Sequence, residues 1–95
     1  MNKAEALPLL EANLQAWRQR SYAELASLIG SQTCTELVGA SGATYQVEIE
    51  AFWDAKPAGD IRVVGSIDDS GFRAFVPLTA DFILAPDGHF VGEGS

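Results

Sequence analysis

The chain has 95 residues, 47% of them hydrophobic and 20% charged, a balance that excludes intrinsic disorder and predicts a single domain over residues 1–95. Six basic and thirteen acidic residues give a net charge of −7, which argues against direct nucleic-acid binding, because proteins that bind nucleic acids carry a basic footprint. A lone cysteine, an N-terminus without a signal-peptide pattern and the absence of a long apolar run predict a cytoplasmic protein that does not insert into a membrane.

The first helix is predicted from one apolar stripe. Four large residues recur at helical spacing: Leu7, Leu10, Leu14 and Trp17. Asn2 and Glu5 have the spacing of a capping box, but a helix that begins there carries Pro8 beyond its first turn, where proline costs a hydrogen bond. We therefore expect the helix to begin near Ala6, with Pro8 inside the first turn.

A second, shorter helix follows directly. Ser21 and Glu24 match the capping-box pattern before an apolar run, and Gly30 suits the C-terminal end of a helix. The sequence therefore predicts a helix from about Tyr22 to Ile29, set at an angle to the first.

The middle of the chain changes to strand patterns. Residues 31–43 predict a short strand and a hairpin, with a short helix over residues 35–38 as the alternative. Apolar residues then occupy every second position over residues 45–53 and 61–67, which predicts two strands joined by the loop 54–60.

The longest alternating pattern lies near the C-terminus. Residues 68–71 predict a tight turn, and residues 72–84 predict one long strand, or two strands in line. Pro77 lies in the middle of this stretch and marks an edge, a bulge or a bend, because proline cannot donate a ladder hydrogen bond. A turn over residues 85–88 and a short final strand over residues 89–91 complete the pattern.

Together these elements predict an α+β fold, in which two N-terminal helices pack on one face of a curved four- to five-stranded antiparallel meander. The residues expected to be mostly buried are Leu14, Trp17, Tyr45, Val47, Ile49, Trp53, Val63, Val76, Leu78 and Phe82.

The opposite face of the predicted sheet is not plainly polar. If the two connections are symmetric, Val64 lies opposite Phe75 and beside Glu50, and Phe52 lies beside Arg62. An apolar patch with a charged rim is typical of a protein–protein contact, whereas isolated exposed hydrophobic residues, or a sheet bent at its proline, would need no contact. The predicted interface comprises Phe52, Val64, Phe75 and Ile83, with Arg62 and Glu50 at its border.

Two helices followed by a curved antiparallel meander resemble the NTF2-like branch of the cystatin-like α+β superfamily. Residues 16–25 (AWRQRSYAEL) are similar to the segment that joins the first two helices of such proteins, and residues 81–88 (DFILAPDG) to one of their late hairpins. The chain is shorter than most complete NTF2-like domains. The resemblance implies a cone-shaped sheet that often dimerises, and it transfers no catalytic residue, because the chain matches no catalytic motif of the family.

The sequence predicts no catalytic residue, metal site or cofactor. His89, the only histidine, is expected at the exposed rim of the last hairpin, and most aspartates fall in turns, where they bond the backbone. Glu48 and Glu50 share one strand face, with Arg62 and Arg73 as the expected ion-pair partners.

The sequence as a whole therefore predicts a small acidic, non-enzymatic interaction module that forms a homodimer through its sheet face and that also suits a basic protein partner. The alternative is an NTF2-like enzyme or small-molecule-binding protein with a pocket between the first helix and the sheet. The residues expected to line that pocket are Trp17, Tyr45, Trp53 and His89. A filled interior would favour the module, and a cavity with converging polar groups would favour the alternative.

Overall fold

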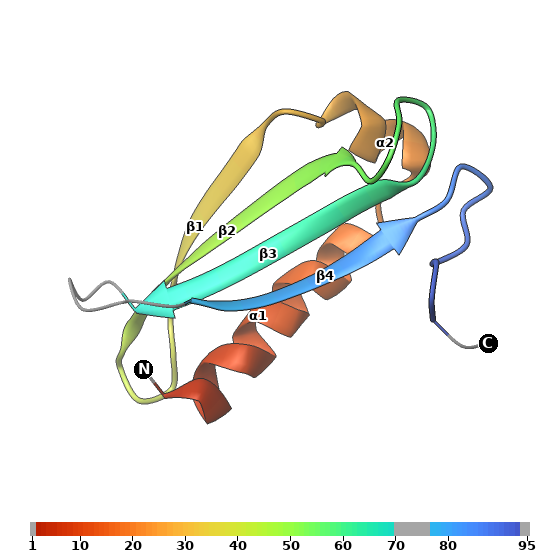
Figure 1. Cartoon of the computed structure of the whole chain (residues 1–95). Helices are drawn as coiled ribbons and strands as arrows, with labels where there is room; N and C mark the ends of the chain where they lie inside the picture. The colour runs from red at the N-terminus through yellow and green to blue at the C-terminus, as the bar shows by residue number, and fades with distance from the viewer. Residues whose placement is uncertain (1, 70–76, 94–95) are drawn as a thin grey trace.

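The computed structural model describes residues 2–69 and 77–93 of the chain. Two helices precede four strands: α1 (Lys3–Arg18), α2 (Tyr22–Ser27), β1 (Gln32–Val38), β2 (Thr44–Trp53), β3 (Ile61–Asp69) and β4 (Leu78–Leu84). The strands form an antiparallel meander in the order β1-β2-β3-β4, and α1 packs across one face of it (Figure 1). This arrangement confirms the predicted α+β fold.

The first helix begins at Lys3, so the predicted start near Ala6 is wrong. The side-chain oxygen of Asn2 accepts a hydrogen bond from the Glu5 N–H (3.2 Å), and the Asn2 carbonyl accepts one from the Ala6 N–H (2.9 Å). These bonds satisfy donors that a helix N-terminus otherwise leaves unpaired. The cap thus accounts for the start at Lys3. The helix continues through Pro8, although proline cannot donate the hydrogen bond expected at that position.

The buried stripe of α1 differs from the predicted one at a single position. Its buried residues are Ala6, Leu10, Leu14 and Trp17, whereas Leu7 is 38% exposed. Ala6 lies one helical turn before Leu10 and is small enough to face the sheet closely. The buried stripe of α1 therefore begins at Ala6, and Leu7 lies at its side.

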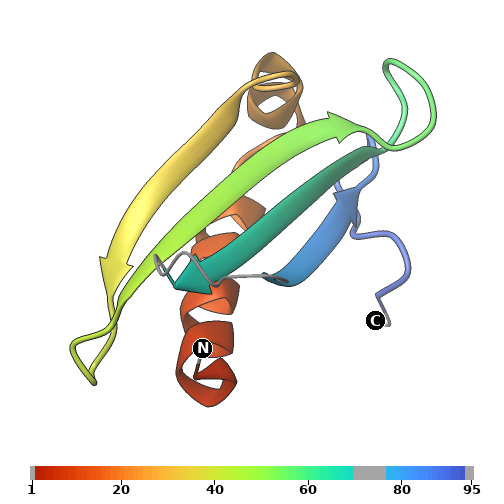
Figure 2. The same ribbon diagram turned by 60° about the vertical axis from the view of Figure 1, so that its left-hand side comes forward.

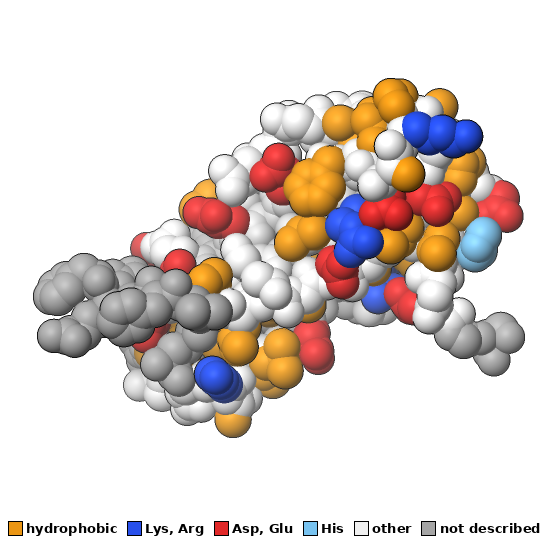
Figure 3. All heavy atoms as spheres, viewed as in Figure 1, with side chains coloured by type: hydrophobic (Ala, Val, Ile, Leu, Met, Phe, Trp, Pro, Cys, Tyr) orange, Lys and Arg blue, Asp and Glu red, His pale blue; other side chains and the backbone are white. Residues whose placement is uncertain are grey.

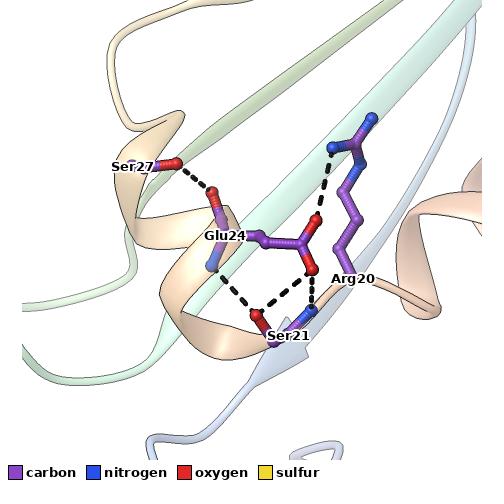
Figure 4. Close-up of polar contacts among 4 residues, drawn as sticks. All are labelled: Arg20, Ser21, Glu24 and Ser27. Atoms are coloured by element: carbon purple, nitrogen blue, oxygen red, sulfur yellow. Dashed lines mark hydrogen bonds and ion pairs between the residues drawn. The ribbon is translucent and has the colours of Figure 1, made fainter.

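The second helix has the predicted capping box, which Figure 4 shows in detail. The Ser21 hydroxyl accepts a hydrogen bond from the Glu24 N–H (3.1 Å), and the Glu24 carboxylate accepts one from the Ser21 N–H (3.4 Å). The Ser27 hydroxyl closes the last turn by donating to the Glu24 carbonyl (2.6 Å). The helix ends at Ser27, earlier than the predicted Ile29, and Gly30 then turns the chain with a φ of +87°.

Two hairpins of the meander have the predicted pairing. Residues 32–38 form β1 and pair with β2, so the strand prediction for this segment is confirmed and the alternative helix over residues 35–38 is wrong. Between β2 and β3, Glu50 pairs with Val64 and Phe52 pairs with Arg62, as the symmetric loop predicts.

The predicted register of the last hairpin is wrong. Val64 pairs with Asp81 on β4 rather than with Phe75, because β3 continues to Asp69 and Ile67 pairs with Leu78. The connection is therefore longer than a tight turn at residues 68–71 allows. Residues 70–76, with Arg73, Phe75 and Val76 among them, lie outside the described residues.

After β4 the chain folds back along the sheet edge. Gly88 has a φ of +94° and donates its N–H to the Ala85 carbonyl (2.9 Å), so the predicted turn is present. Residues 89–91, in contrast, do not form the predicted strand. Phe90 makes a single bridge to Leu84, and the Val91 N–H donates to the Ile83 carbonyl (2.9 Å).

The core lies between α1, α2 and the inner face of β2, β3 and β4. Most predicted core residues within the described ranges are buried, whereas Trp53 and Leu78 are only half-buried. Figure 2 shows that β1 lies to one side of α1, which packs against the other three strands. The side chains of β1 are consequently exposed, except for the half-buried Leu37.

Candidate interaction surface

The sheet face turned away from α1, called the outer face here, brings together most of the predicted interface residues. Alternate residues of β2 and β3 are buried against the helices, so the residues between them point outward. Strand pairing aligns two rows across this face, Phe52–Arg62–Ile83 and Glu50–Val64–Asp81. The predicted neighbour Phe75 lies outside the described residues, so its part in the interface stays a prediction.

Phe52 is the most exposed hydrophobic residue of these two rows, with 37% of its surface accessible. Val64 lies diagonally beside it on β3, Ile83 lies beyond Arg62 on β4, and both are half-buried. Beside Phe52 the face is hollowed into a depression of about 150 Å³, which six side chains line: Gln32, Glu48, Glu50, Phe52, Val64 and Ser66. Figure 3 shows this face, with acidic side chains spread over the sheet around hydrophobic ones.

Arg62 is the only basic residue within the four described strands, and its charge is already balanced. Its Nε donates to Asp54 Oδ1 (2.8 Å), and its Nη1 contacts the Asp81 carboxylate. The hydrogen bond to Asp54 and the nearby charge of Asp81 raise the pKa of Arg62 above its ordinary value. The prediction that Arg62 pairs with Glu48 or Glu50 is therefore wrong.

Glu36 on β1 and Glu48 on β2 have amide partners rather than cationic ones. Glu48 accepts a hydrogen bond from the Gln32 side chain (3.1 Å), and Glu36 accepts one from the Gln46 side chain (3.0 Å). These bonds hold the carboxylates in place but leave their charges unneutralised. This half of the outer face therefore presents fixed negative charge next to the exposed ring of Phe52.

A second polar cluster fixes the shape of the β1–β2 hairpin. The Glu5 carboxylate accepts hydrogen bonds from the Tyr45 hydroxyl (2.6 Å), the Ser41 hydroxyl (2.7 Å) and the Ser41 N–H (2.9 Å). The bond to Tyr45 is the main cause of the lowered pKa of Glu5, and the same bond raises the pKa of Tyr45 to about 12. A side chain at Gly39 would clash with this cluster, because its Cβ would lie 2.6 Å from Glu5 Cδ.

A hollow lies beside the first helix, between α1 and β4. It measures about 600 Å³ and is lined by Glu11, Leu14, Gln15, Arg18, Gln19, Ala80, Asp81, Phe90 and Glu93. None of the four predicted pocket residues, Trp17, Tyr45, Trp53 and His89, lines this hollow. Trp17 and Tyr45 are buried, and Trp53 lies near the ring of Tyr22, with 6.5 Å between centroids.

The cation in this hollow is engaged by the chain itself. Arg18 forms two bonds to the Glu93 carboxylate (2.8 and 2.9 Å), and its guanidinium carbon lies 4.8 Å from the ring centroids of both Phe82 and Phe90. The two rings meet edge to face. Arg18 therefore ties the C-terminal segment to α1, a structural role that the sequence pattern did not indicate.

His89 lies at the exposed rim of the last hairpin, as predicted, and its ring contacts the Asp87 carboxylate. The backbone N–H of His89 donates to the same carboxylate (3.0 Å), and this bond is the main reason that the pKa of Asp87 lies below its ordinary value. Among the described residues, Asp87 is the hydrogen-bond and ion-pair partner of the ring.

Within residues 2–69 and 77–93, no three His, Cys, Asp or Glu side chains lie close enough together to hold a metal ion. The helices in these ranges are also too short or too polar to cross a membrane.

Comparison of the chain with protein-family models, with curated proteins and with solved structures finds no match. The resemblance to NTF2-like proteins therefore stays a prediction. What the chain does has to be inferred from its own surface.

Proposed function

We propose that the chain is a non-enzymatic interaction domain that binds a basic segment of a partner protein through the outer face. One observation carries this proposal. Glu48 and Glu50 line the depression beside the exposed Phe52, and Glu36 lies farther along the same face, while Arg62, the cation of this face among the described residues, is balanced by two aspartates. An apolar anchor with a rim of uncompensated charge suits a partner that offers lysine or arginine around a hydrophobic side chain.

The same charges bear on the predicted homodimer. A twofold contact between two outer faces would set the acidic residues of one copy against those of the other, and like charges across an interface are repulsive. The charge pattern thus favours a basic partner over a second copy. Light scattering at low ionic strength distinguishes a monomer from a homodimer, because repulsion between like charges is then least screened. We expect a monomer.

The competing function, an enzyme or ligand-binding protein, would use the hollow beside α1. Catalytic sites need groups that converge on a reacting atom, and Arg18, the cation among the described lining residues, is held by Glu93 and two aromatic rings. The hollow therefore supports docking of the C-terminal segment better than chemistry.

A binding experiment with matched variants tests the proposal. The probe is a fluorescent peptide of alternating lysine and valine, and the variant carries Glu48→Gln and Glu50→Gln. We expect its dissociation constant for the peptide to rise about tenfold at low salt, because two carboxylates of the outer face, the exposed Glu48 and the half-buried Glu50, lose their charge.

The control variant carries Glu11→Gln and Asp87→Asn, which make the same change of net charge away from the outer face. It should bind like the wild type. Equal weakening in both variants would show that only net charge matters, and weakening in the control alone would point to the hollow beside α1. Either result would overturn the proposal.

A further inference from the structure

The free edge of β1 is the other unusual feature of this side of the molecule. β1 pairs with β2 on one side, and no strand among the described residues pairs with its other side. The opposite edge of the sheet differs at its end, because Phe90 and Val91 bond Leu84 and Ile83, the last two residues of β4. β1 forms one free edge of the sheet (Figure 1), and the β4 edge is covered only at Ile83 and Leu84.

The alternation of an antiparallel ladder identifies which backbone groups of β1 face the open side. Gly39 donates its N–H to the Ala43 carbonyl (2.8 Å), which makes Gly39 a hydrogen-bonded position of the β1–β2 hairpin. Hydrogen-bonded positions alternate along an antiparallel strand, so the odd-numbered residues of β1, like Gly39, direct their backbone groups to β2. The N–H and C=O groups of Cys34 and Glu36, and of the residues at both ends of β1, are thus directed to the open edge.

β1 also lacks the features that protect a strand edge from pairing. Edge strands are commonly blunted by lysine, proline or a bulge. The strand Gln32–Val38 contains no lysine and no proline, and its register with β2 is continuous. Because α1 lies beneath the other strands, Thr33 and Thr35 are exposed as well, so that both faces of β1 are open to a partner (Figure 2).

We infer that the basic segment bound by this domain is extended and adds to the open edge of β1 as a further strand. This inference rests on the proposed function. In such a pairing, the residues of the segment opposite Cys34 and Glu36 would point to the outer face, because residues directly opposite in a sheet share a face. Lysine or arginine at those alternate positions would reach Glu36 and Glu48.

Charge selects this occupant over a second copy of β1. The strand carries one acidic residue, Glu36, and no basic one, so that two copies would bring no opposite charges together. A basic segment pairs its backbone with the edge and its side chains with the carboxylates at the same time.

The experiment tests the contribution of backbone hydrogen bonds separately from that of charge, again with the lysine–valine peptide. Two further peptides carry N-methyl groups on alternate residues, in one case on the lysines and in the other on the valines. N-methylation removes a backbone donor without changing charge. We expect one of the two patterns to weaken binding at least about tenfold and the other to leave it nearly unchanged, because only alternate N–H groups of an added strand face β1.

A protein variant, Cys34→Pro, removes one donor of the open edge, a place where proline is tolerated in sheets. It should also weaken binding while circular dichroism and denaturant unfolding show that the chain is folded. The methylated peptides keep the test valid if this variant does not fold.

The possible results separate the two claims. Binding that falls with Glu48→Gln and Glu50→Gln but is indifferent to both methylation patterns would overturn strand addition and leave the proposed function standing. No binding of the lysine–valine peptide to the wild type, or equal affinity for a threonine–valine peptide, would overturn the proposed function and this inference together.

Discussion

At the scale of single residues, Glu5 connects the start of α1 to the β1–β2 hairpin through its backbone and its side chain. The N–H of Glu5 completes the helix cap made by Asn2, while its carboxylate reaches the β1–β2 hairpin. Its partners Ser41 and Tyr45 lie 36 and 40 residues away along the chain. Helix α1 is therefore attached to the sheet at its first turn as well as along its buried stripe.

The bond between Glu5 and Tyr45 predicts a loss of stability at both extremes of pH. The pKa of Tyr45 is raised from 10.0 to about 12 in the folded chain, so its contribution is complete below pH 10 and is lost as the pH rises through about 12. The pKa of Glu5 is lowered from 4.5, so its contribution is present above that value and is lost as the pH falls through the folded pKa.

Denaturant unfolding over a range of pH measures both effects. Tyr45→Phe should remove the alkaline loss attributed to Tyr45 and reduce the acid loss, because only Ser41 then donates to Glu5. The control is Tyr22→Phe, which removes a hydroxyl that donates to the Gly59 carbonyl rather than to a carboxylate. An alkaline profile that is the same in Tyr45→Phe as in the wild type would show that the bond does not contribute.

At the scale of elements, the packing of α1 on the sheet depends on the missing side chain at Gly65. A Cβ there would lie 2.9 Å from Leu10 Cδ1 and 3.1 Å from Leu14 Cδ2. Both leucines are buried and have little space to move away. Gly65 on β3 therefore sets the distance between helix and sheet.

Gly65→Ala should lower the free energy of unfolding by about 1–3 kcal/mol, because the added methyl group overpacks the interface between α1 and β3. The neighbouring Ser66→Ala serves as the control, since its side chain points to the outer face and meets no helix. Chemical denaturation gives both values. If Gly65→Ala is as stable as Ser66→Ala, the helix is packed less tightly on the sheet than the contacts indicate.

The elements also show what the sequence could predict. Strand β2 was readily predicted, because one of its faces packs on α1 and its residues alternate accordingly. The register between β3 and β4 could not be predicted, since the turn signal at residues 68–71 does not reveal that β3 continues to Asp69. Local turn chemistry indicates where a chain is able to reverse, but the pairing partners are fixed by burial on the whole sheet.

The candidate surface was predictable to the same degree. Residue parity alone places Phe52, Val64 and Glu50 on one face. It could not indicate that Arg62 is balanced by Asp54, which lies in a loop, or that Tyr45 is buried beside Glu5 instead of lining a pocket. Those contacts join segments whose distance depends on the packed fold, which no sequence spacing specifies.

At the scale of the whole molecule, the two sides of the sheet differ in what covers them and in the side chains they carry. The inner side packs on the helices and is closed by hydrophobic residues, and the hollow beside α1 is tied down by Arg18 and Glu93. The outer side, with the open edge of β1, carries exposed carboxylates and the exposed ring of Phe52. The proposed function uses the part of the net charge of −7 that lies next to Phe52, at Glu48 and Glu50.

An NMR titration of the isotopically labelled chain with the lysine–valine peptide tests most directly whether binding uses the outer face, because it reports on backbone amides throughout the chain at once. We expect the largest shift changes at Cys34, Glu36 and residues 48–52, with the amides of α1 nearly unchanged. Changes concentrated at Gln15, Gln19 and Glu93, around the hollow beside α1, would contradict the account, as would a spectrum that excess peptide leaves unaltered.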